Sequence, residues 1–128
     1  EGYVDDAPAG PFDGATCLLT LHFLDAAERR CTAAEIRRRL KPGAPFVAAH
    51  CSFPQDPAER DQWLSRYAAF AISSGADRDQ ALGAKAAIAA SLATFSPEAD
   101  AAILAEAGFR DVQLFYAAFT WRGWVGYA

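Results

Sequence analysis

The sequence predicts an α/β fold in which helices flank a sheet and an antiparallel hairpin ends the chain. Two nearly continuous apolar runs, at residues 15–21 and 46–50, are typical of strands covered on both faces in a parallel sheet. A helical pattern rich in arginine separates them, so the three segments form a βαβ unit, which should be right-handed. Two aromatic, β-rich runs at 112–119 and 121–128 have almost nothing between them and therefore indicate the hairpin.

Length and composition fit a single domain that spans residues 1–128. Of the 128 residues, 52% are hydrophobic and 22% are charged, which is the balance of a globular chain. The net charge of −4 provides no general attraction to nucleic acid or to an anionic membrane. No apolar run approaches the about 18 residues that indicate a transmembrane helix, so no membrane contact is expected.

Three cysteines and the start of the chain bear on its cellular setting. Cys17, Cys31 and Cys51 are odd in number and form no CxxC pair, so we expect buried free thiols in a reducing, cytoplasmic compartment. The chain begins at Glu1, contains no methionine and shows no signal-peptide pattern, which suits an internal fragment.

The helix after the first strand has recognisable ends. Asp25 is a candidate N-cap, and Glu28 three residues later completes a capping box. Pro42 and Gly43 end the helix after about residue 40. Its basic residues are expected on the solvated surface, with an RNA-contacting face as the alternative. They are Arg29, Arg30, Arg37, Arg38, Arg39 and Lys41.

Three more helices are expected between the second strand and the hairpin. In the first of them Trp63, Tyr67 and Phe70 form an apolar stripe, which is either core or an aromatic lid over a cofactor or substrate. The second is rich in alanine. The residues that cap or end these helices are, in chain order, Asp56 and Gly75, then Asp77, then Ser96 and Gly108.

This order of elements resembles the C-terminal half of a class I S-adenosylmethionine (SAM) dependent methyltransferase. The turns Leu40-Lys41-Pro42-Gly43 and Ala107-Gly108-Phe109 match those before strands five and six of that family. The resemblance implies a Rossmann-like half-sheet of strands four to seven, the last two forming an antiparallel hairpin. The G-x-G-x-x-G loop that holds the cofactor is not in this sequence. The resemblance therefore implies a fragment of an enzyme that methylates a small molecule or a nucleic acid such as tRNA.

Within the superfamily, residues 19–24 and 74–109 are most similar to the branch of carboxy-SAM synthases. This chain has Tyr3 where that branch has Asp, Leu19 where it has Asn, and Lys85 where its Arg holds the extra carboxylate. Because lysine cannot make a bidentate fork, methyl transfer from SAM is the first hypothesis. A carboxy-SAM synthase and a non-catalytic binding or assembly module are the alternatives.

The resemblance also implies where a cofactor would lie. Tyr3 and Val4 would lie beside the adenine, and Leu19 and Thr20 beside the methionine part. The alternative is that all four are ordinary loop and core residues.

His22 is the candidate catalytic residue. It follows the first strand at the mouth of the expected cleft, where its pKa would suit a general base or a substrate contact. The alternative is a hydrogen-bonded loop histidine. Candidates for substrate binding are Trp63, Tyr67 and Lys85. With two histidines and no suitably spaced partners, no metal site is expected.

The sheet predicted for this chain has an open edge. Without strands one to three, the strand at 15–21 lacks a neighbour on one side, and it is apolar on both faces. Such an edge pairs readily with another chain, so we expect a homodimer.

Overall fold

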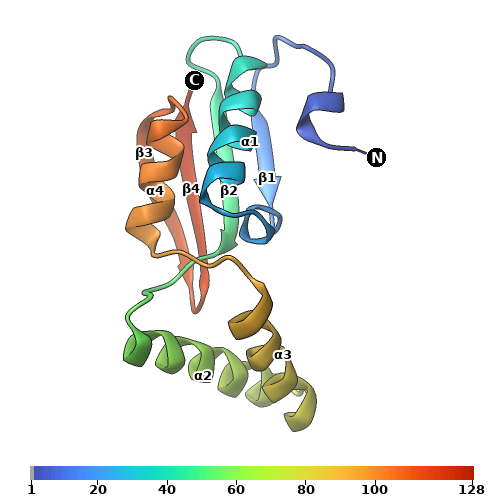
Figure 1. Ribbon diagram of the computed structural model, residues 1–128, viewed down its shortest axis with the longest axis vertical. Helices are drawn as coiled ribbons and strands as arrows, with labels where there is room; N and C mark the ends of the chain where they lie inside the picture. Colours follow the sequence, from blue (N-terminus) through green and yellow to red (C-terminus); the bar gives the residue numbers. More distant parts are fainter. Residues whose placement is uncertain (1) are drawn as a thin grey trace.

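The computed structural model describes residues 2–128 and contains a four-stranded mixed sheet (Figure 1). Its strands are β1 (Ala15–Leu18), β2 (Pro45–Cys51), β3 (Arg110–Ala118) and β4 (Trp121–Tyr127). Their order across the sheet is β1-β2-β4-β3, with β1 parallel to β2 and β4 antiparallel to both of its neighbours. The predicted α/β fold and its terminal hairpin are confirmed.

Two helices lie on one face of the sheet and enclose the core. α1 (Ala26–Arg38) and α4 (Pro97–Glu106) run side by side across that face in Figure 1. The core between them and the sheet includes Phe46, Leu104 and Trp124, each at most 2% exposed. Asp25 and Glu28 form the predicted capping box at the start of α1. The residues between β1 and α1 are therefore anchored by the sheet on one side and by the capped start of α1 on the other.

The other two long helices project beyond one end of the sheet as a helical hairpin (Figure 1). They are α2 (Pro57–Ser73) and α3 (Arg78–Ser91), and Asp56 and Asp77 cap them as predicted. The buried residues of α2 are Leu64 and Ala68. The aromatic stripe beside them is only partly covered, because Trp63 and Tyr67 are half-buried and Phe70 is exposed.

The first strand is shorter than predicted. Leu19 has a φ of 59°, in the left-handed region, so the chain leaves the sheet after Leu18. Residues Leu21–Phe23 then form a short 3₁₀-helix, η2, where the prediction had continued the strand to residue 21. A second 3₁₀-helix, η1 (Val4–Asp6), lies in the irregular N-terminal segment; Glu1 is outside the described residues.

Two predictions about surface exposure are wrong. Arg29 and Arg39 were expected on the solvated face of their helix, but they are 1% and 6% exposed. All three thiols are free, as predicted, yet Cys51 alone is buried, because Cys31 faces solvent and Cys17 is half-buried on the edge strand β1.

Candidate functional site

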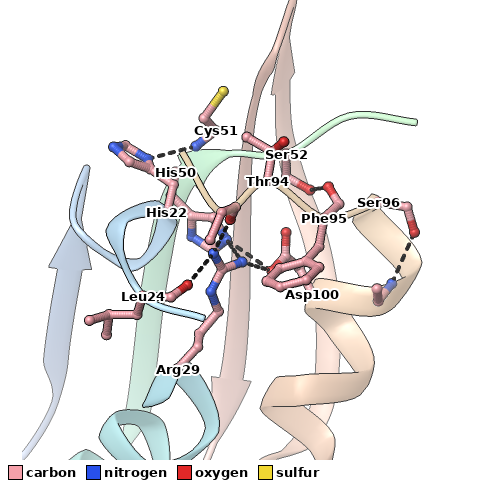
Figure 2. Close-up of polar contacts among 12 residues, drawn as sticks. His22, Leu24, Arg29, His50, Cys51, Ser52, Thr94, Phe95, Ser96 and Asp100 are labelled. Carbon is pink, nitrogen blue, oxygen red and sulfur yellow. Dashed lines mark hydrogen bonds and ion pairs between the residues drawn. The ribbon is translucent and has the colours of Figure 1, made fainter. Parts of the chain in front are cut away.

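Buried polar side chains converge where β1 and β2 end, under the connections to the helical hairpin (Figure 2). They come from five separate parts of the chain: η2, α1, the end of β2, the segment after β2, and α4. Each is at most 4% exposed. In that order they are His22, Arg29, His50, Ser52 and Asp100.

The centre of this polar cluster is an ion pair between Arg29 and Asp100, which are 1% and 0% exposed. Nη1 of Arg29 donates to Oδ1 of Asp100, and Nε2 of His50 lies 3.2 Å from the same oxygen. Burial by itself raises the pKa of the Asp100 carboxyl. The hydrogen bond from His50 and the charges of His50 and Arg29 outweigh burial and hold that pKa below its ordinary value.

Arg29 also contacts two chain segments, one just before α1 and one between α3 and α4. Its Nη2 donates to the carbonyl oxygens of Leu24, at 3.2 Å, and of Ala93, at 2.6 Å. Its guanidinium carbon lies 4.6 Å from the centre of the Phe95 ring. Ser52 lies in the other connection of the helical hairpin, between β2 and α2. Its Oγ donates to the carbonyl of Phe95 at 3.1 Å. Both connections are therefore fixed at this cluster.

The cluster is suited to positioning rather than to chemistry. Asp100 Oδ2, His50 Nδ1 and Arg29 Nε are buried without a hydrogen-bond partner among residues 2–128. Leaving such atoms unpaired costs stability. None of the three side chains is more than 1% exposed, so a substrate cannot reach them from solvent.

His22 is buried, with 4% of its surface exposed, so the prediction of an open position at the cleft mouth is wrong. Its Nδ1 accepts a hydrogen bond from the backbone N–H of Cys51 at 3.1 Å. Because that N–H can only donate, the proton of the neutral ring lies on Nε2. Burial, followed by the nearby charges of His50 and Arg29, lowers the pKa of His22 to about 4. At neutral pH His22 is therefore an uncharged hydrogen-bond donor.

Three of the four predicted cofactor residues line one hollow. This hollow, of about 430 Å³, lies between η1, β1 and α1, and Tyr3, Val4 and Thr20 contribute to its wall. The fourth, Leu19, is 57% exposed and does not line it. The left-handed backbone at Leu19 is the reason, because it turns the chain between Leu18 and Thr20.

The predicted substrate residues do not form one site. Lys85 Nζ bonds Asp61 Oδ1 at 2.8 Å and Ser65 Oγ at 2.9 Å, in a groove between α2 and α3. Trp63 instead lies against Arg122 of β4. Tyr67 is half-buried one helical turn further along α2.

The described residues meet neither the requirements of a metal site nor those of a membrane-spanning helix. Residues 2–128 contain no group of three His, Cys, Asp or Glu side chains arranged to hold a metal ion. Within the same residues no helix combines the length and the apolar character needed to cross a membrane.

Sequence reasoning missed the Arg29–Asp100 pair, although a signal for it exists. Arg29 lies four residues before Ala33 and seven before Ile36, so it belongs to the apolar stripe of α1. Asp100 is similarly placed three and four residues before Ile103 and Leu104 on α4. Opposite charges on the buried stripes of two helices indicate a buried pair.

Comparison with known proteins identifies the fold. No family model matches the chain, and no curated protein matches it in sequence. Human N-acetylserotonin methyltransferase in complex with SAM matches 99% of this chain with 32% of its own, at 17% identity and a TM-score of 0.64. PigF with SAH matches 96% of this chain with 32% of its own, at 16% identity and a TM-score of 0.63.

A third solved structure comes from Thermotoga maritima and is described as a SAM-dependent methyltransferase, possible histamine N-methyltransferase. It matches 98% of this chain with 61% of its own, at 18% identity and a TM-score of 0.59. The chain thus spans about a third of the length of the first two proteins. At these identities the likeness establishes the fold, which is that of the C-terminal half of a SAM-dependent methyltransferase.

We predict that Asp100→Ala lowers the free energy of unfolding by on the order of 3–5 kcal/mol, because it leaves the Arg29 charge buried and uncompensated. The double variant Arg29→Met/Asp100→Leu should recover most of this loss, since it removes both charges. Urea unfolding followed by circular dichroism measures the difference. Glu106→Ala is the matched control: it breaks the exposed pair with Arg30, 3.7 Å apart, and should cost less than about 1 kcal/mol. Equal losses for Asp100→Ala and Glu106→Ala would contradict the assignment.

We also predict that stability falls as the pH drops from 6.5 toward 4 because of His22. The folded protein takes up this proton only near pH 4, whereas the unfolded chain takes it up near 6.5. Between these values the unfolded state binds more protons, so acid favours unfolding. His22→Asn keeps an acceptor for the Cys51 N–H but does not titrate, so its unfolding midpoint in urea should change less over this range. Parallel profiles for both proteins would exclude His22 as the cause.

Proposed function

We propose that this chain is the C-terminal part of an enzyme that transfers a methyl group from SAM to a small molecule or a nucleic acid. The observation that carries the proposal is the strand order β1-β2-β4-β3 with an antiparallel β4, in a fold shared with SAM-dependent methyltransferases over almost the whole chain. Free thiols are compatible with the cytoplasmic location proposed for it.

The residues at the hollow beside β1 suit one side of such a cofactor. Tyr3 and Val4 offer an aromatic and an apolar surface for the adenine, and Thr20 offers a hydroxyl near the methionine part. Leu19, an exposed neighbour of Thr20, would lie beside the same part of the cofactor. In open α/β sheets ligands bind beyond the carboxyl ends of the strands, which is where Leu19 and Thr20 follow β1.

When bound, SAM would supply an activated methyl group for in-line attack by the acceptor. Such a transfer depends mainly on holding the two reactants in line, so the protein's part is positioning. His22 would contribute by donating a hydrogen bond from Nε2 to the acceptor, since Nδ1 is occupied by the Cys51 N–H. Trp63 and Tyr67 would contact the acceptor from α2. Lys85 could do so only after leaving Asp61 and Ser65.

A non-catalytic assembly module is the second candidate, and the edge strand β1 favours it. β1 is the outermost strand beside β2, and Leu18 and Leu19 at its end are 54% and 57% exposed. Phe23, 66% exposed, extends this apolar edge. A second copy could pair with β1, and the homodimer is proposed on that ground. The carboxy-SAM synthase stays a third hypothesis, which the pairing of Lys85 with Asp61 does not favour.

We predict that the 128-residue chain binds SAM weakly or not at all, whereas the longer gene product binds SAM and transfers its methyl group. The reason is that this sequence lacks the glycine-rich loop whose backbone N–H groups would hold the cofactor. Calorimetric titration of both proteins with SAM and with carboxy-SAM tests this. Failure of the longer protein to bind either compound would favour the assembly module, and tighter binding of carboxy-SAM would favour the synthase. Micromolar binding of SAM by the short chain would contradict the prediction.

We predict that the 128-residue chain self-associates at tens of micromolar, because the open edge and its apolar residues favour pairing. Light scattering over a concentration series measures the mass. Thr16→Pro removes a backbone N–H from the edge strand and Leu18→Lys adds a charge to it, so each should shift the equilibrium toward the monomer. A monomeric mass for the wild type at these concentrations would exclude the dimer.

A further inference from the structure

Two guanidinium groups lie against one indole ring where α2 meets the turn between β3 and β4. The guanidinium carbon of Arg66 is 4.9 Å from the centre of the Trp63 ring, and that of Arg122 is 5.2 Å from it. Arg122 is only 8% exposed, whereas Arg66 is exposed. Within residues 2–128 neither arginine forms an ion pair with a carboxylate. The junction is therefore a concentration of unpaired positive charge.

The turn fixes one side of the Arg122 guanidinium without neutralising it. Nη1 donates to the carbonyl oxygens of Phe119, at 2.5 Å, and of Trp121, at 2.8 Å. Neither Nε nor Nη2 has a hydrogen-bond partner in the described part of the chain. Burial lowers the pKa of Arg122, and Cys51 and then Glu98 act in the opposite sense. Two carbonyls and an indole face thus hold a cation that still has one free N–H edge.

The described residues place no carboxylate in contact with this charge. A bound anion at its free N–H edge would supply a counter-charge for Arg122.

The junction adjoins the site described above. Trp121 pairs with Cys51 across β2 and β4, and its ring lies 5.7 Å from the ring of His22. Trp121 also joins the small core under α2, against which Trp63 packs. Arg122 itself pairs with His50 across β2 and β4, so the junction lies at the same end of the sheet as the buried cluster.

We propose that Arg122 and Arg66 form an anion subsite that binds a carboxylate or phosphate group of a small ligand, with Trp63 as its platform. Guanidinium groups suit this task because their planar N–H fork matches the paired oxygens of such anions. The assignment of that ligand as the methyl acceptor rests on the proposed function, but the anion site itself does not.

Benzoate and inorganic phosphate are the probes for the test, each titrated into the 128-residue chain with chloride at equal ionic strength as the reference. The readout is the ¹⁵N NMR signals of the arginine Nε–H and tryptophan indole N–H groups. We expect saturable shifts at Trp63, Arg66 and Arg122 with at least one probe, and the probe that binds distinguishes a carboxylate from a phosphate ligand. Absence of saturable shifts with both probes overturns the proposal.

Substitutions distinguish a specific anion site from nonspecific attraction of anions to positive charge. Arg122→Gln and Arg66→Gln should each weaken binding by about tenfold or more, as expected for loss of a hydrogen bond to a charged group. Arg78→Gln is the matched control, because Arg78 is exposed on α3 and its loss changes the net charge equally. Equal weakening by Arg78→Gln and Arg66→Gln overturns the proposal. Arg66 is exposed, so its variant decides the test even where Arg122→Gln unfolds. Anion binding is measured without SAM, so failure of methyl transfer and failure of this site are told apart.

Discussion

The buried ion pair between Arg29 and Asp100 is the interaction on which the arrangement of this chain depends. It joins α1 to α4 directly, and the shared contact of His50 with Asp100 adds the end of β2. An ion pair buried this deeply adds little net stability, because the free energy needed to remove both ions from water is about as large as their mutual attraction. Its effect is to specify geometry. Nη2 of Arg29 donates to the carbonyls of Leu24 and Ala93, so the same side chain links the segment after η2 to the segment before α4.

The position of His22 is fixed by the same part of the structure. The carbonyl of His22 accepts a hydrogen bond from the N–H of Ala93, and its ring accepts one from the N–H of Cys51. His22 is thus held at both ends, by the segment between α3 and α4 and by the last residue of β2. The same burial, followed by His50 and Arg29, lowers the pKa of its ring and keeps it neutral. A histidine held in this way cannot take a proton at Nδ1 without losing its bond to Cys51, so the structure suits it to donating a hydrogen bond rather than to abstracting a proton.

Elements whose ends are set by local chemistry could be predicted from the sequence, and those set by tertiary contacts could not. The capping box of Asp25 and Glu28 and the caps of α2 and α3 depend on side chains within three residues of their targets. The end of β1 depends instead on a left-handed Leu19, a conformation that a leucine rarely adopts and that no local pattern announces. The candidate site divides in the same way. Three cofactor candidates share one hollow, whereas the burial of His22 follows from long-range packing.

Two of the three buried arginines in the described residues, Arg29 and Arg122, show how structural and ligand-binding charges can be told apart. Arg29 and Arg122 both donate to backbone carbonyls and both contact an aromatic ring, so these features do not distinguish them. The difference is the counter-charge. Arg29 contacts the carboxylate of Asp100, which is as deeply buried as Arg29 itself. Arg122 forms no ion pair with a described carboxylate and shares its indole with a second arginine, Arg66. A purely structural role accounts for the first arrangement, because the fold there supplies its own anion. For the second, no described carboxylate forms an ion pair, which is the physical reason to look for a ligand at Trp63.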